Sequence, residues 1–89
     1  MGQEKNYKSL INDIIIQQTL VLGPDIVLFK ARSVRGLTLN QDNQVQKMIG
    51  NPDQILEDLV NSYVALSGQI LKTTLQPIFA KYPDIKIPV

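Results

Sequence analysis

The chain has 89 residues, of which 44% are hydrophobic and 19% charged, and its formal net charge is +1. This balance predicts one globular domain, excludes a disordered chain, and lacks the strong basic excess typical of nucleic-acid-binding domains. His, Cys and Trp are absent, which excludes disulfides, argues against structural zinc and removes the usual nucleophile and base pairs of catalysis. We therefore expect a non-enzymatic protein with no catalytic, cofactor or metal site.

The N-terminal segment does not look like a targeting sequence. It is polar, and the apolar run behind it is interrupted by Asn12, Asp13, Gln17 and Gln18. Such a run fits neither a secretory signal peptide nor a membrane span. We therefore expect a soluble cytoplasmic protein without membrane contact.

The first predicted helix covers residues 5–22. Its apolar residues recur at spacings of three and four, as in an amphipathic helix, and they are Tyr7, Leu10, Ile11, Ile14, Ile15 and Leu20 or Val21. The β-branched run at 14–16 would also suit a strand, but the length of the pattern and its polar interruptions favour a helix.

Gly23 and Pro24 predict a junction, followed by a second helix that ends near Ser33. Gly commonly ends a helix, and Pro is favoured at the first position of the next. The second helix is apolar almost all round, from Ile26 to Phe29. We expect it to be largely buried, or to expose a patch that meets a partner.

Residues 37–49 alternate between apolar and polar types, which predicts a β-hairpin. A two-residue loop is one alternative for its turn. A three-residue loop would instead pair Leu39 with Val45 and keep Ile49 on the same face as Val45. We favour the three-residue loop, with Asn43 in the left-handed region of backbone space.

A long C-terminal helix is predicted over about residues 52–81. Asn51 is a suitable N-cap, and the Pro that follows it suits the first helical position. Gly68 and Pro77 interrupt the apolar pattern, and a proline inside a helix kinks or ends it. The last segment, 83–89, could add an edge strand or extend as a flexible tail.

Such a helix would outgrow the domain that carries it. At 1.5 Å per residue it would be ~45 Å long, against a diameter of about 30 Å for a compact chain of this size. We therefore predict a homodimer or a larger assembly of the chain with itself. The predicted dimer interface consists of Leu56, Leu59, Val60, Tyr63, Leu66 and Ile70.

The clearest polar signal is a basic edge formed by Lys30, Arg32 and Arg35. No acidic residue lies between Asp25 and Asp42 to oppose these charges. One interpretation is that they only complement the negative end of the second helix dipole. The functional interpretation is a partner- or anion-binding site for an acidic protein, a nucleic acid or a phosphorylated ligand.

A cation site at the start of the last helix is the weaker alternative. Asp53 and Glu57 share a helix face and could hold a hard cation together with Asn51. Acidic residues are, however, common in the first turns of helices, and we predict no metal there.

Together these features predict an α+β, mainly helical single domain over residues 1–89. It has two N-terminal helices, a β-hairpin (about 37–49) and a long C-terminal helix (about 52–81). We expect a regulatory, adaptor or sensing module that acts through protein–protein contacts as a homo-oligomer. The element order also resembles a winged helix-turn-helix with a C-terminal dimerisation helix, which implies a DNA-binding transcriptional regulator as the alternative. The second helix lacks the polar face that base contacts need, so nucleic acid is the less favoured partner.

Overall fold

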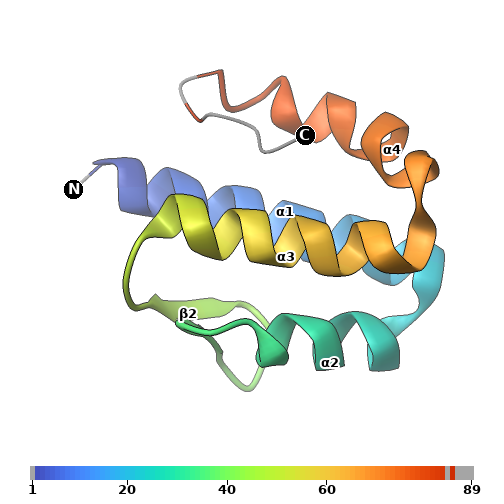
Figure 1. The fold of residues 1–89 in the computed structure, drawn as a ribbon. Coiled ribbons are helices and arrows are strands. Elements are labelled where there is room, and N and C mark those ends of the chain that lie inside the picture. Colours follow the sequence, from blue (N-terminus) through green and yellow to red (C-terminus); the bar gives the residue numbers. More distant parts are fainter. Residues whose placement is uncertain (1, 84, 86–89) are drawn as a thin grey trace.

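The computed structural model describes residues 2–83 and 85, and it places the side chains of these residues except 2–5, 69, 70 and 72. The elements in chain order are α1 (Gly2–Leu22), α2 (Pro24–Ser33), β1 (Leu37–Leu39), β2 (Val45–Met48), α3 (Pro52–Ser67) and α4 (Gln69–Phe79). Figure 1 shows three layers: α1 and α3 lie in the middle, α4 covers one side, and α2 with the hairpin covers the other. The predicted mainly helical fold with a β-hairpin is confirmed.

The junction between the first two helices lies where the sequence predicts it. The backbone N–H of Gly23 donates to the carbonyl of Thr19 at 2.9 Å and closes the last turn of α1. Pro24 then occupies the first turn of α2, where its missing N–H costs no helical hydrogen bond. Short-range backbone chemistry is enough to explain this boundary.

The hairpin has the predicted turn but an unpredicted bulge. Leu39 pairs with Val45, and Asn43 has φ 64°, so the three-residue loop is confirmed. The register then shifts between Thr38 and Leu39, which reverses the side-chain alternation beyond the bulge. Met48 is therefore buried, whereas Ile49 is 60% exposed. The prediction that Ile49 shares the face of Val45 is wrong for this reason.

The predicted long C-terminal helix is also wrong, because it is divided at Gly68. Asn51 caps α3 as expected, accepting the N–H of Asp53 at 2.9 Å. Gly68 ends α3 with φ 66°, and α4 then folds back over the middle layer (Figure 1). Pro77 lies inside α4, which continues to Phe79.

The reason for the break is burial. Folding back covers Leu71, Leu75 and Ile78, which are at most 8% exposed. A straight continuation would leave these side chains in water, at a cost of ~1.5–3 kcal/mol each. That loss exceeds what one interrupted helical turn costs, so the chain takes the folded-back form.

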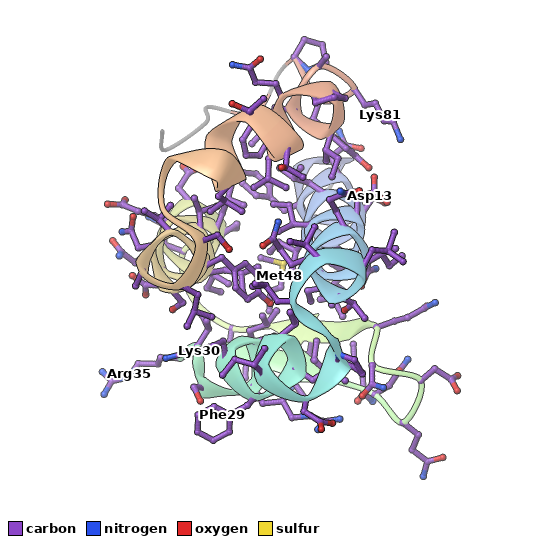
Figure 2. All side chains as sticks on the ribbon, turned by 90° about the vertical axis from the view of Figure 1, so that its right-hand side faces the viewer. Asp13, Phe29, Lys30, Arg35, Met48 and Lys81 are labelled. Atoms are coloured by element: carbon purple, nitrogen blue, oxygen red, sulfur yellow. The ribbon has the colours of Figure 1, made fainter. Side chains whose placement is uncertain are left out.

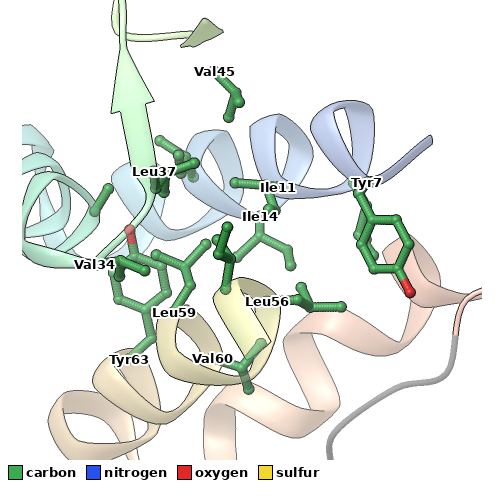
Figure 3. Close-up of a cluster of buried hydrophobic side chains, with 14 of the residues drawn as sticks. Tyr7, Ile11, Ile14, Val34, Leu37, Val45, Leu56, Leu59, Val60 and Tyr63 are labelled. Atoms are coloured by element: carbon green, nitrogen blue, oxygen red, sulfur yellow. The ribbon is translucent and has the colours of Figure 1, made fainter. Parts of the chain in front are cut away.

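One hydrophobic core joins the three layers. Figure 3 shows its centre, where side chains of α1 and α3 meet those of the segment that joins α2 to β1. The radius of gyration is 11.8 Å, and the accessible surface is 5555 Å². A compact monomer of this mass is expected to expose ~5,200 Å². A single copy therefore already buries about as much surface as a self-contained domain.

The C-terminal segment is described only at Pro83 and Ile85, and Ile85 is buried. The predicted edge strand or flexible tail over 83–89 otherwise lies outside the described residues. Within the described part of the chain, no helix is both long and apolar enough to cross a bilayer.

Candidate protein-binding surface

The three residues of the predicted basic edge do not form one cluster. Arg32 points to the hairpin, where its Nη2 donates a 2.5 Å hydrogen bond to Oδ1 of Asn43. Lys30 and Arg35 lie on the other side of α2, away from the hairpin loop (Figure 2). Positions 30 and 32 of a helix differ by about 200° around its axis. The positive charges are thus divided between two faces, and one small anion would not contact all three.

Four of the predicted interface residues form the core of a single copy instead. Leu56, Leu59, Val60 and Tyr63 are 0% exposed, and Figure 3 shows them packed inside the chain. They cannot contact a second copy while this fold is intact. The apolar stripe of α3 is wide because α1, α2 and α4 of the same chain all pack against this helix.

The other two predicted interface residues, Leu66 and Ile70, are not part of this described core. Leu66 is 42% exposed near the end of α3, so it is open to a partner. The side chain of Ile70 lies outside the described set. The self-association itself stays a prediction, but the overhanging helix from which it followed does not exist in this fold.

An unpredicted groove opens where α1, α2 and the hairpin loop meet. It is lined by Asn12, Ile15, Ile16, Thr19, Leu20, Pro24, Leu28, Asp42, Asn43 and Gln44. Its volume is about 260 Å³, below the range of about 300–1,000 Å³ that is common for small-molecule sites. The groove therefore suits one or two side chains of a larger partner better than an enclosed ligand.

Large apolar side chains stand exposed beside this groove. Leu20 is 78% exposed and Ile16 is 57% exposed, and both line it. Phe29 is 64% exposed and points away from the core (Figure 2); it does not line the groove but borders an adjoining pocket on α2, and Leu28 lines both. We call Ile16, Leu20, Leu28 and Phe29 the apolar groove face. Single exposed apolar residues are ordinary, whereas a group beside a groove is typical of an interaction site.

Hydrogen bonds between elements hold the walls of the groove. Oδ1 of Asn12 accepts the backbone N–H of Val45 at 2.7 Å and joins α1 to β2. Arg32 joins α2 to the loop through Asn43. Inside the loop, Oδ1 of Asn40 accepts two backbone N–H groups at 2.8 and 3.1 Å. The groove is therefore built before a partner arrives, which lowers the entropy cost of binding.

Part of the apolar groove face could be predicted from the sequence. Ile16 and Leu20 are four residues apart, so they share one side of α1, and that side differs from the one carrying Ile11 and Ile14. The apolar residues of α1 thus cover more of the helix circumference than one core contact needs, and this pattern indicates a second, exposed apolar side. The predicted alternative that the second helix exposes an apolar patch holds for Phe29. No pattern in the sequence could place the hairpin loop beside these helices.

Two carboxylates accept hydrogen bonds that hold elements of the fold together. The hydroxyl of Tyr7 donates to Asp53 at the start of α3, and the hydroxyl of Tyr82 donates to Asp13 at 2.8 Å. The bond to Asp53 raises the pKa of Tyr7 to about 12, and burial followed by the bond to Asp13 does the same for Tyr82. Among the residues that the structure describes, no three metal-ligating side chains gather.

Comparisons with protein-family models, curated proteins and solved structures found no match. The class of protein is therefore defined by architecture: a small, mainly helical α+β domain with one antiparallel hairpin.

Proposed function

We propose that this chain is a non-enzymatic binding module, regulatory or adaptor in role, whose apolar groove face binds a partner protein. The observation that carries this proposal is the exposure of Ile16 and Leu20 along a groove whose walls are fixed by hydrogen bonds. Burying a large apolar side chain stabilises a complex by ~1.5–3 kcal/mol. Covering two or three of them therefore supplies a useful share of a micromolar affinity, which corresponds to about 8 kcal/mol.

The lining of the groove indicates the chemistry of the partner. Its lining is mainly apolar, and Asn12, Thr19, Asn43 and Gln44 add polar side chains to it. Apolar contacts combined with a smaller number of polar ones are usual in a protein interface. Asp42 is the one charged residue among those that line the groove. We infer a partner segment that inserts apolar side chains and places a Lys or Arg opposite Asp42.

Photo-crosslinking tests this proposal with the full chain. A benzophenone side chain replaces Leu20 in one sample and Leu66 in the other, because both residues are exposed and apolar but only Leu20 lines the groove. Each is irradiated in a lysate of the cells that make the protein, and adducts are identified by mass. We expect a discrete protein adduct from position 20 that position 66 does not give.

A second change makes the result specific. Phe29→Glu in the position-20 probe should remove the adduct and leave the circular dichroism spectrum unchanged, since Phe29 is exposed and surface substitutions rarely change stability by more than about 0.5 kcal/mol. The same adducts from positions 20 and 66, or adducts that survive Phe29→Glu, would show that the apolar groove face is not the binding surface.

The DNA-binding regulator, which was predicted from the order of the elements, stays the alternative prediction, and no contact among the described residues favours it. Of the three cations of the basic edge, Arg32 is engaged by the hairpin loop, and Lys30 and Arg35 lie on the other side of α2. DNA retention that falls steeply with salt concentration would support this alternative instead.

A further inference from the structure

The connection between α3 and α4 is a single residue, Gly68. Its φ of 66° and ψ of −142° lie in a region that side chains make unfavourable, so the turn depends on glycine. A Cβ added there would meet nothing within 4 Å. Backbone conformation, and not crowding, is therefore what confines this position to glycine.

In all other respects the segment is built as one helix. The helical pattern continues on both sides of Gly68, and α3 and α4 are each helical up to this residue. If Gly68 were helical, one helix from Pro52 to Phe79 would be ~42 Å long. The longest dimension of the folded chain is 32 Å. In that conformation α4 would leave its own domain and project beyond it.

Departure of α4 would expose the apolar surface of α1 and α3 beneath it to water, which is unfavourable. α4 packs on α1 and α3 through Leu71, Leu75 and Ile78, all of which are buried. The segment that fits this surface best is an identical α4, because it restores the same contacts. The natural occupant is therefore α4 of a second copy of this chain.

In the folded-back, or closed, chain, a buried hydroxyl without a partner among the described residues lies next to this turn. Thr19, Ser33 and Ser62 each donate their side-chain hydroxyl to the carbonyl four residues earlier. Ser67, which precedes Gly68, has instead a buried Oγ with no partner in the described structure. A buried hydroxyl without a partner carries a free-energy cost, and the closed chain carries this cost at the residue before Gly68.

We propose that the chain exchanges α4 between two copies. In the exchanged dimer, α3 and α4 form one continuous helix, and each α4 occupies the surface on α1 and α3 of the other copy. The closed monomer and the exchanged dimer share their core contacts and differ at Gly68, so the conformation of this residue sets the balance between them. This proposal is independent of the apolar groove face.

Gly68→Ala is the variant that tests the exchange. Alanine disfavours the closed turn and is a better helix former than glycine, so both effects act in the same direction. Light scattering after size exclusion should show a shift from the 10.0 kDa monomer to twice that mass, with a dimer dissociation constant at least about tenfold lower than in the wild type.

Gly23→Ala is the matched control. Gly23 also joins two helices as a single residue, has a positive φ of 90°, and has open space where a Cβ would lie. Pro24 follows it, however, and makes a fused helix of α1 and α2 unfavourable by ~3 kcal/mol, because its ring would clash with the carbonyl of Leu20. We expect this variant to lose stability but to stay monomeric. Equal dimerisation of both variants would overturn the exchange, because strain at any helix junction would then explain it.

Intermolecular distances separate exchange from ordinary surface pairing. Gln76 of α4 is exposed, and the chain has no Cys, so Gln76→Cys gives a unique spin-label position in the Gly68→Ala background. Spin-labelled chain is unfolded and refolded together with ¹⁵N-labelled chain. In an exchanged dimer, the spin label on α4 of one copy should broaden the NMR signals of the α1 amides in the other copy. This broadening should persist with Phe29→Glu, which disrupts only the apolar groove face.

The exchange can also be tested in a chain that keeps Gly68, in case Gly68→Ala does not fold stably. Refolding the spin-labelled Gln76→Cys chain, with Gly68 kept, together with ¹⁵N-labelled wild type at high concentration should trap a small dimer fraction with the same broadening pattern, which returns to monomer only slowly because release requires α4 to detach. If Gly68→Ala stays monomeric and the refolded chain with Gly68 gives no such dimer, or if broadening appears at the groove and not at α1 beneath α4, the proposal is wrong.

Discussion

The hydroxyl of Tyr63 donates a 2.9 Å hydrogen bond to the backbone carbonyl of Val27 inside the core. The bond joins α3 to α2, and both side chains are fully buried. Burial raises the pKa of Tyr63 well above its ordinary value, so the phenol stays protonated and able to donate. One aromatic residue thus fills the core and fixes the position of the helix that carries part of the groove.

Tyr63→Phe should lower the free energy of unfolding by ~1 kcal/mol, because it removes this hydrogen bond and keeps the ring. Tyr63→Ala should cost ~3–5 kcal/mol, since it also leaves a cavity. Urea denaturation at neutral pH measures both, with an unchanged slope as the sign that the folded state is intact. A Phe variant as stable as the wild type would mean that the Val27 carbonyl needs no second donor.

Gln18 is 1% exposed, and its Oε1 has no hydrogen-bond partner within the described structure. Replacing it with Met keeps a long flexible side chain and removes the unpaired oxygen, so Gln18→Met should stabilise the chain by ~1 kcal/mol. Gln17→Met at the neighbouring, partly exposed position should stay within about 0.5 kcal/mol of the wild type. Destabilisation by Gln18→Met in thermal or urea unfolding would show that the donor side of this amide is needed.

Gly36→Ala should be the most damaging glycine substitution. An added Cβ would lie 2.3 Å from the carbonyl oxygen of Ile49, and φ at Gly36 is +88°. Gly50 also has a positive φ, +102°, but open space around its Cα, so Gly50→Ala isolates the backbone strain of ~1–3 kcal/mol. Crowding should make Gly36→Ala cost at least ~1 kcal/mol more. Equal losses in the two variants would mean that the hairpin moves aside easily.

Alkaline pH should destabilise the chain through its tyrosines. The folded-state pKa values of Tyr7 and Tyr82 are raised from 10.0 to about 12. A raised pKa means that the folded state holds the proton more tightly, so its contribution to stability is complete below about pH 10 and is lost as the pH rises to about 12.

Tyr7→Phe checks this assignment. The variant cannot ionise at position 7, so its free energy of unfolding should fall less steeply than that of the wild type between about pH 10 and 12. The difference between the two proteins should be constant below about pH 9, where both tyrosines are neutral in either state. Parallel curves across the alkaline range would show that Tyr7 does not carry the effect.

The sequence by itself determined the features that depend on neighbouring residues. Gly23 followed by Pro24 sets the first helix junction, and Asn51 caps α3 through its own side chain. Asn43 accepts a positive φ, which selects the three-residue hairpin loop and the pairing of Leu39 with Val45. Each of these is a local backbone preference, so a pattern of a few residues predicts it.

Only the tertiary structure decided where α4 goes and what lies on the surface. The segment after Gly68 is helical whether the chain runs straight or folds back, and burial of Leu71 and Leu75 selects the folded-back form. The same packing put Leu56, Leu59, Val60 and Tyr63 of the predicted interface into the core, and it left Arg32 on the opposite side of α2 from Lys30 and Arg35. The groove needs α1, α2 and the hairpin loop side by side, and contacts between segments distant in sequence leave no periodic signal along the chain.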